Sequence, residues 1–288
     1  MKNTSRLREL FAGLPILIVP GAAEAINARL IEEAGFAAVY ATGAGIANSL
    51  LALPDIGLLS FSEMLESIRR IVQAVNIPVI ADADEGYGSP LNVRRTVQEY
   101  EHAGVAAIQI EDQASPKKCG HFDGKEVIPA DEMVQKIRAA VDARRDPDLV
   151  LIARTDALST HGYAEAVRRG RLYAANGADV IFVEAPTDRE QIEHLPKDIA
   201  APLLFNLTEG AKSPETNPGE LQRFGYRAVI FPNTLLRISM LAVQSALGVL
   251  KSEQSTQSLV SRMMSWEERQ HIVHLSEYQK LDEEYGKT

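Results

Sequence analysis

Residues 78–84 read P-V-I-A-D-A-D, a short apolar run that ends in two carboxylates. The next run of this kind, residues 106–112, reads A-A-I-Q-I-E-D and ends in the same way. Near-continuous apolar runs of this length are typical of strands buried on both faces, as in a parallel sheet. Polar groups at their ends predict chemistry at the carboxyl edge of that sheet, because the ends of parallel strands meet there.

Six similar runs extend the pattern in both directions along the chain. They occupy residues 16–21, 37–43, 149–155, 180–186, 202–207 and 228–233. Amphipathic helix patterns lie between the runs, and three of them end in Ala-Gly or Asn-Gly, which stops a helix. Eight β/α units in about 250 residues predict a TIM (β/α)8 barrel, an α/β fold, over residues 1–251. An open doubly wound sheet is the alternative, but eight strands are many for one.

Residues 252–288 form a second, helical segment beyond the predicted barrel. Apolar residues recur there at three- and four-residue steps, which is the spacing of a helix face. Because this segment follows the eighth β/α unit, we expect it to pack on the outside of the barrel or on another subunit.

Composition and charge argue against several classes of protein. The formal net charge is −9 and no basic patch stands out, so we expect no nucleic-acid partner. A single cysteine cannot form an internal disulfide, which fits a reducing cytoplasm. Gly13, Pro15 and Pro20 interrupt the apolar stretch near the N-terminus, which argues against a signal peptide. No apolar run approaches the ~18 residues of a membrane span, so we expect no membrane association.

Asp82 and Asp84 are candidate metal ligands. Two residues apart on a strand, their carboxylates should point to the same side, where the like charges repel each other. A hard divalent cation removes that repulsion, and Glu111 at the end of the next strand can approach the same point. Ligation by oxygen alone favours Mg²⁺, or Mn²⁺, over zinc. The alternative is a pair of aspartates that caps the following helix.

Two further strand ends carry groups suited to binding an anion. Thr42-Gly43-Ala44-Gly45 follows the second strand, and small residues with free N–H groups can cradle a carboxylate or phosphate. Arg154 can bind a carboxylate through two parallel hydrogen bonds, and Arg237 after the eighth strand can do the same. Each arginine could instead serve a structural ion pair.

The only cysteine lies in S-P-K-K-C-G-H, residues 115–121. The connection around it runs roughly from Gln113 to Ala130, which is long for a loop between a strand and a helix. Lys117, Lys118 and His121 should lower the pKa of the Cys119 thiol by favouring the thiolate. A cysteine of the hydrophobic core would not have such neighbours, so we expect a reactive thiol.

K-K-C-G-H resembles the K-[KR]-C-G-H catalytic loop in the lyase branch of the isocitrate lyase/phosphoenolpyruvate mutase superfamily. The resemblance extends over nearly the whole chain and is a specific one. Supporting matches are A-N-S-L-L-A-L-P-D (47–55), A-D-A-D-E-G-Y-G (81–88), I-E-D-Q (110–113), I-A-R-T-D (152–156), V-E-A-P (183–186) and N-L-T-E (206–209).

The resemblance implies a complete set of site residues. Mg²⁺ would be held by Asp82 and Asp84, with Asp55 and Glu111 completing its shell. Cys119 would act as the acid. Arg154, Tyr40 and Glu184 would be catalytic as well. Substrate would be bound by residues at the strand ends and in the thiol loop, namely Thr42, Gly43, Ala44, Gly120, His121, Asn206, Thr208 and Arg237.

The implied reaction is a retro-aldol cleavage of a 2-hydroxy di- or tricarboxylate, of the 2-methylisocitrate or 2,3-dimethylmalate type. It would release a pyruvate-like keto acid and a carbanion that Cys119 protonates. Tyr40 and Glu184 are the candidates for accepting the hydroxyl proton. Met263-Met264-Ser265-Trp266 replaces a family M-x-T-R whose arginine contacts substrate, which favours a dicarboxylate over a tricarboxylate.

Other functions remain as alternatives. Within the fold they are phosphonomutase chemistry of the carboxyphosphonoenolpyruvate or phosphoenolpyruvate type and oxaloacetate hydrolysis or decarboxylation, and outside catalysis a barrel that only binds carboxylates. The resemblance also implies that the C-terminal helices are exchanged between neighbouring subunits of a homotetramer, with Trp266 in a subunit interface.

Overall fold

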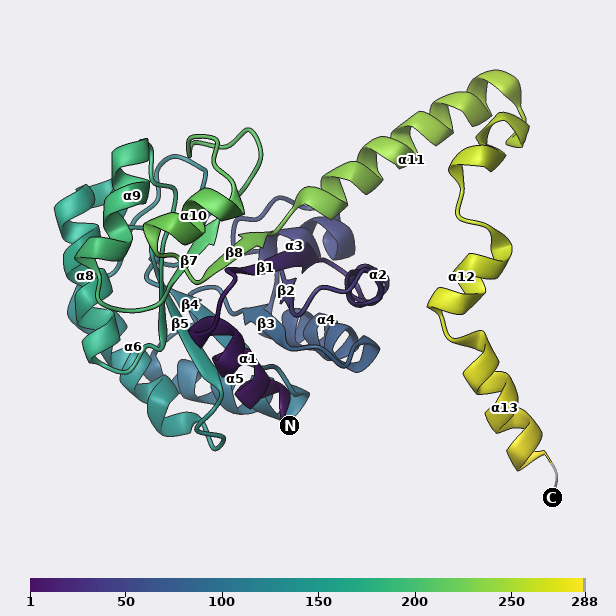
Figure 1. Cartoon of the computed structure of the whole chain (residues 1–288). Helices are drawn as coiled ribbons and strands as arrows, with labels where there is room; N and C mark the ends of the chain where they lie inside the picture. Colours follow the sequence, from purple (N-terminus) through teal and green to yellow (C-terminus); the bar gives the residue numbers. More distant parts are fainter. Residues whose placement is uncertain (287–288) are drawn as a thin grey trace. The chain divides into compact units, whose positions relative to one another are not determined.

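The apolar runs form short parallel strands that pair in chain order and close into a barrel, shown in Figure 1. The last strand pairs with the first, from Leu17 opposite Ala228 to Pro20 opposite Phe231. The computed structural model describes residues 1–286, and in that range the sheet consists of β1 (Leu17–Ala22), β2 (Val39–Ala41), β3 (Val79–Asp82), β4 (Ala107–Glu111), β5 (Val150–Thr155), β6 (Val180–Val183), β7 (Leu203–Asn206) and β8 (Ala228–Phe231). The predicted (β/α)8 barrel is confirmed.

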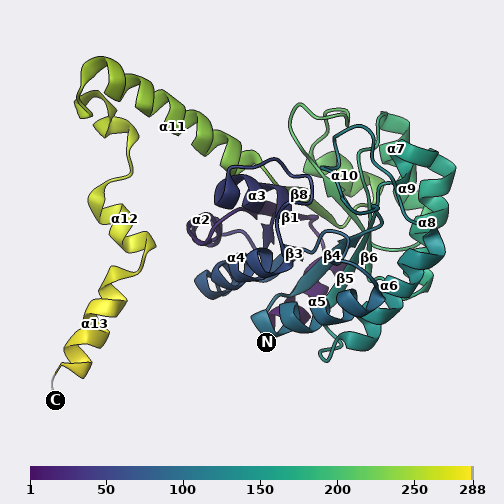
Figure 2. The ribbon, with the colours of Figure 1, turned by 180° about the vertical axis from the view of Figure 1, so that it is seen from behind.

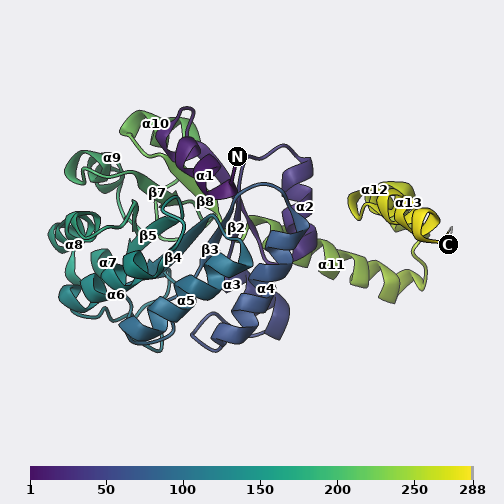
Figure 3. The same cartoon turned by 90° about the horizontal axis from the view of Figure 1, so that it is seen from below.

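Helices surround the strands, as the view from below in Figure 3 shows. They are α2 (Ala25–Glu33), α3 (Gly43–Leu51), α4 (Phe61–Ala74), α5 (Pro90–Ala103), α6 (Ala130–Ala143), α7 (Ala157–His161), α8 (Tyr163–Ala175), α9 (Arg189–Asp198) and α10 (Pro218–Phe224). Local sequence sets their ends: Ser60 and Glu63 form a capping box at the start of α4, and Gly104 ends α5 with φ 92°. The same ring is seen from behind in Figure 2.

Helix α1 (Asn3–Ala12) closes one end of the barrel. Its Leu7 and Phe11 are buried in the cluster that fills the barrel interior, together with Leu17, Ala107 and Val150 near the starts of strands. The amino ends of the strands are therefore sealed by apolar packing. Chemistry is left to the opposite, carboxyl ends, as in other barrels of this kind.

The chain divides into two compact units, Met1–Leu235 and Leu236–Thr288. The boundary predicted from sequence lay later, between residues 251 and 252, because the helical pattern after β8 was assigned to the barrel. Helix α11 (Thr234–Glu253) instead belongs almost entirely to the second unit. Over the described part of residues 252–288 the structure contains η1 (Gln257–Arg262), α12 (Trp266–Ile272) and α13 (Leu275–Tyr285).

Helix α11 is both apolar and exposed. Its length and composition are sufficient to cross a membrane, with a mean hydropathy of 1.3 over its most apolar window and none of its described residues buried. Arg237 and Gln244 interrupt its apolar residues, so the sequence shows no unbroken apolar run there. These exposed apolar side chains need a partner, whether lipid or protein.

Candidate active site

A pocket lies at the carboxyl ends of the strands. Most of the residues predicted from sequence line it: Tyr40, Thr42, Ala44, Asp55, Asp82, Cys119, Gly120, His121, Arg154, Glu184, Asn206 and Thr208. Arg237 lies in the second unit, so its assignment to the site stays a prediction. Residues from the ends of distant strands and from the thiol loop thus meet in one place.

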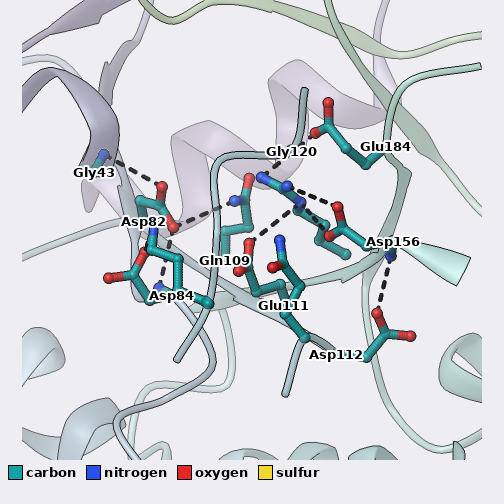
Figure 4. Close-up of polar contacts among 12 residues, drawn as sticks. Gly43, Asp82, Asp84, Gln109, Glu111, Asp112, Gly120, Asp156 and Glu184 are labelled. Atoms are coloured by element: carbon teal, nitrogen blue, oxygen red, sulfur yellow. Dashed lines mark hydrogen bonds and ion pairs between the residues drawn. The ribbon is translucent and has the colours of Figure 1, made fainter. Parts of the chain in front are cut away.

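The two aspartates after β3 are close together, but not for the reason predicted. The strand ends at Asp82, and Asp84 has the left-handed backbone conformation with φ 45°, so strand alternation does not reach it. Asp82 accepts hydrogen bonds from the backbone N–H of Asp84 at 3.1 Å and of Gly43 at 3.3 Å, as Figure 4 shows. A tight turn therefore holds both buried carboxylates close together, and Asp82 lines the pocket.

The ammonium of Lys117 lies among these carboxylates, a contact that the sequence does not indicate. Its ammonium is paired with Asp55 and lies 2.6 Å from Asp84 Oδ1. Burial raises the pKa of Asp84 to about 7, against the opposing pull of Lys117. Among the described residues, no three His, Cys, Asp or Glu side chains already surround one point as metal ligands.

The cluster of carboxylates formed by Asp55, Asp82, Asp84 and Glu111 nevertheless suits a hard divalent cation. Glu111 is buried, and its Oε1 has no hydrogen-bond partner in the part of the chain that the structure describes. Burial also raises the pKa of Glu111, which Arg154 partly offsets. Buried, oxygen-rich groups whose ionised form is disfavoured are those that Mg²⁺ stabilises most. Asp55, Asp82, Asp84 and Glu111 therefore supply a suitable donor set.

The environment of the thiol contradicts the predicted acidic cysteine. Burial raises the pKa of Cys119, and a hydrogen bond from the backbone of His121 only partly opposes this. Lys117 faces Asp84, while Lys118 Nζ donates to the Gly124 carbonyl at 2.6 Å. Burial lowers the pKa of His121, so its ring is neutral at pH 7. The three basic neighbours thus do not lower the pKa of the thiol, and Cys119 stays protonated.

Arg154 is the centre of a buried ion-pair network and lies 3.3 Å from Glu111. It donates to both carboxylate oxygens of Asp156, at 2.9 and 3.1 Å, and lies 3.4 Å from Glu184. Its guanidinium also stacks over the Phe182 ring at 5.2 Å. Because it lines the pocket while held in this network, both predicted roles, structural pairing and carboxylate binding, are compatible with its position.

Two backbone N–H groups of the predicted anion cradle already donate hydrogen bonds to side chains of the protein. Thr42 caps the start of α3 by accepting from Gly45 N–H at 3.3 Å, and the Gly43 N–H is directed at Asp82. Ala44 lines the pocket. The amides at 43 and 45 therefore hold the wall of the pocket together, and an anion bound here would have to share the Gly43 N–H.

Tyr40 is held as a neutral phenol. Burial, with the nearby Asp82 carboxylate, raises its pKa well above the usual value. This argues against Tyr40 as the group that removes the hydroxyl proton and leaves Glu184, which is fully buried beside Asn206 Nδ2 at 3.3 Å.

Sequence analysis assigned no role to two residues of the site. Asp156 ends the R-T-D stretch after β5, where strand alternation from Arg154 could have marked it. Lys125 is a buried lysine in the thiol loop that pairs with Asp156. Nothing in its local sequence distinguishes it from a surface lysine, because its partner is distant along the chain.

A closed β/α barrel with carboxylates, a buried arginine and a protonated thiol at the carboxyl ends of its strands is a barrel enzyme built for carboxylic acid chemistry. The chain belongs to the phosphoenolpyruvate phosphomutase family, whose model matches residues 7–250. This confirms the superfamily indicated by the K-K-C-G-H loop.

Named relatives narrow the class. The chain is 41% identical over 286 residues to a 2,3-dimethylmalate lyase of Eubacterium barkeri, with 99% of each chain covered. It is 42% identical over 281 residues to a 2-methylisocitrate lyase of Aeropyrum pernix, covering 98% of this chain and 90% of the relative. These relatives are lyases, and the chain is accordingly a carbon–carbon lyase.

Solved structures agree with this grouping. A crystal structure of 2,3-dimethylmalate lyase matches with a TM-score of 0.93 and 38% identity, over 99% of this chain and 96% of that one. A phosphonopyruvate hydrolase in complex with oxalate and Mg²⁺ matches with a TM-score of 0.90 and 30% identity, over 99% of both chains. The fold thus holds a metal and a small dicarboxylate in at least one relative.

Proposed function

We propose that this protein is a Mg²⁺-dependent lyase that cleaves a 2-hydroxydicarboxylate of the 2,3-dimethylmalate type into a pyruvate-like keto acid and a second carboxylate. The observation that carries the proposal is a pocket in which the protonated thiol of Cys119 lies near a cluster of carboxylates. A carbon–carbon lyase of this kind needs an acid for the carbanion and a cation for the hydroxy acid.

Asp55, Asp82, Asp84 and Glu111 are the residues that would hold Mg²⁺, with Mn²⁺ as the alternative. When bound, the metal polarises the hydroxyl and carboxylate of a 2-hydroxy acid. The carboxylates must first exchange Lys117 for the cation, since its ammonium contacts Asp55 and Asp84. Metal binding and the position of the thiol loop should therefore be coupled.

The protein's own side chains account for the proton movements. Glu184 is our candidate for the base that accepts the hydroxyl proton. The hydroxyl then becomes the keto carbonyl while the adjacent C–C bond breaks and its electron pair stays on the departing carbon. Cys119 gives its Sγ proton to that carbon, which requires the protonated thiol that burial maintains.

Binding of the substrate follows from the remaining groups. Arg154, Asn206, Thr208 and the neutral His121 line the pocket and would contact the carboxylates. Thr42 and Ala44 line it too, and Gly43 lies between them with its N–H directed at Asp82. Gly120 would lie beside the substrate because its backbone packs directly on Arg154 and Glu184.

A second candidate function is chemistry at a P–C bond or at oxaloacetate. The match to a phosphonopyruvate hydrolase over 99% of both chains favours keeping it. This second function differs from the proposed lyase reaction in the bond that reacts. It needs the same carboxylate-binding site and the same metal.

A substrate panel tests the proposal. We expect keto acid release from 2,3-dimethylmalate to exceed that from 2-methylisocitrate, isocitrate, oxaloacetate and phosphonopyruvate by at least about tenfold in kcat/KM. Excess EDTA should abolish turnover, and added Mg²⁺ should restore it. Full activity in chelator would exclude the metal role. Turnover confined to phosphonopyruvate or oxaloacetate would favour the second candidate.

We also propose that the protein is a cytoplasmic homotetramer. In the first unit, Ile18 on the outer side of β1 and Phe36 are each 36% exposed in an apolar groove that no described element of that unit covers. In the second unit, α11 exposes an apolar face with Leu241 at 67%. Exchange of the C-terminal helices between copies would bury both surfaces, with Trp266 in the interface.

A further inference from the structure

Lys125 is a buried lysine that the proposed reaction does not use. Its side chain is only 2% exposed, and its ammonium lies 2.6 Å from Asp156 Oδ1. The same ammonium donates a hydrogen bond to the carbonyl of Gly120. Lys125 therefore joins the thiol loop to the end of β5 through two buried contacts.

The Gly120 carbonyl is a sensitive point of the loop, because Gly120 separates Cys119 from His121. A Cβ on Gly120 would lie 2.4 Å from Arg154 Nη2 and 2.6 Å from Glu184 Cδ. The backbone thus rests directly on the pocket wall. Whatever holds this carbonyl sets how closely the thiol approaches the pocket.

Asp156 offers Lys125 a rigid anchor. The Asp156 carboxylate also binds Arg154. The Asp156 backbone N–H donates to Asp112 at 2.9 Å, as Figure 4 shows. Asp112 in turn accepts from Arg169 at 2.9 Å and Tyr173 at 2.7 Å. These buried groups belong to the ends of β4 and β5 and to α8, which are fixed parts of the barrel.

A second side-chain contact of the loop is much more exposed. Lys212 lies 2.6 Å from Asp123, but their side chains are 37% and 95% exposed. Exposed ion pairs of this kind contribute little to stability. Lys117 holds the loop on the other side of Cys119, through its buried contacts with Asp55 and Asp84. The buried contacts of Lys125 are therefore the stronger candidates for holding the Gly120 side of the loop.

We propose that Lys125 is a positioning residue that clamps the Gly120 carbonyl to Asp156 and so keeps the Cys119 loop closed over the pocket. The clamp concerns loop geometry alone. Only the chemical use of the positioned thiol rests on the proposed function.

The single cysteine makes the clamp directly measurable. In Lys125→Met, alkylation of Cys119 by iodoacetamide should be at least about tenfold faster than in the parent, because the loop opens. Loss of a nearby cation would by itself disfavour the thiolate and slow the reaction, so the sign separates loop opening from electrostatics. The matched control Lys212→Met, which removes the exposed pair of the same loop, should stay within about twofold.

Two further measurements separate clamping from unfolding. The faster labelling should not change in low urea, since local opening exposes little surface. Lys125→Gln, whose amide can still donate to the Gly120 carbonyl, should label at an intermediate rate. If substrate turnover is found, Lys125→Met should lower kcat at least about tenfold with a smaller change in KM.

An unchanged or slower labelling rate in Lys125→Met would overturn the proposal, as would an equal acceleration in Lys212→Met. If neither Lys125 variant folds, Lys125 is a core residue and not a loop clamp. Labelling needs no substrate, so faster labelling without lyase activity would uphold the clamp and refute the proposed function.

Discussion

Cys119 shows how a single side chain takes its chemistry from distant groups. Its neighbours in sequence are cations, yet Lys117 pairs with Asp55 and Asp84 while burial raises the thiol pKa. Sequence analysis predicted a thiolate, whereas burial keeps this thiol protonated, and its reactivity stays a prediction. The long loop and its polar composition are local features, whereas the partners of the two lysines lie elsewhere in the fold.

Substitution of Cys119 by serine tests its role as acid. A serine hydroxyl fills nearly the same space but is a far weaker acid, so kcat should fall by about 100-fold or more. Binding of pyruvate in the presence of Mg²⁺, measured by calorimetry, should stay within about threefold of the parent. Turnover within tenfold of the parent would remove Cys119 from the mechanism.

The raised pKa of Asp84 predicts that the stability of the metal-free protein depends on pH. Its folded pKa of about 7 lies above its usual value, so its contribution to stability is present at low pH and is lost as pH rises through about 4 to 7. Asp84→Asn should therefore be more stable than the parent at pH 8, on the order of 2 kcal/mol, and nearly equal at pH 4.

Urea unfolding in EDTA at both pH values measures this difference. The exposed Asp142→Asn is the matched control and should show no such dependence on pH. Saturating Mg²⁺ should stabilise the parent more than Asp84→Asn. A parent that gains stability between pH 4 and pH 8 relative to Asp84→Asn would contradict the assignment.

At the level of elements, the sequence predicts the strands but not the residues at which they end. Each apolar run became a strand because burial on both faces needs little beyond local composition. The left-handed conformation of Asp84 was missed, since it depends on the turn that its backbone makes toward Glu111, which donates to the Asp84 carbonyl. Site geometry depended on such turns more than on strand alternation.

Helix α1 yields a prediction about barrel stability. Leu7 is fully buried in the interior cluster, so Leu7→Ala should lower the free energy of unfolding by about 2–5 kcal/mol. Glu9→Ala, on the exposed side of the same helix, should change it by less than about 0.5 kcal/mol. Thermal or urea unfolding measures both. Equal stability of the two variants would show that α1 is not part of the barrel's core.

At the scale of the whole molecule, the chain alone leaves much apolar surface in water. Sequence showed that residues 252–288 were too apolar to remain exposed, but not that α11 belongs with them. The pattern of α11 looks like that of any barrel helix; what distinguishes it is that none of its described residues is buried. Only the structure could reveal this.

Charges on α11 should disrupt the assembly. Leu241→Glu combined with Leu247→Glu, at positions 67% and 59% exposed, should give a smaller species by light scattering and a marked loss of activity. Leu91→Glu on α5, 79% exposed in the first unit, should leave the mass unchanged. The single Trp266 should also shift its fluorescence to the red as its interface opens. A parent that is fully active as a monomer would refute the tetramer.

The pairing of β8 with β1 bears on how the protein is made. Leu17 and Ala228 are neighbours in the sheet although more than two hundred residues separate them along the chain. A ribosome delivers the N-terminal strand first, so β1 waits with an unpaired edge until residues 228–231 emerge. Ring closure is consequently a late step, and nascent chains stopped before β8 should depend on chaperones that cover open strand edges.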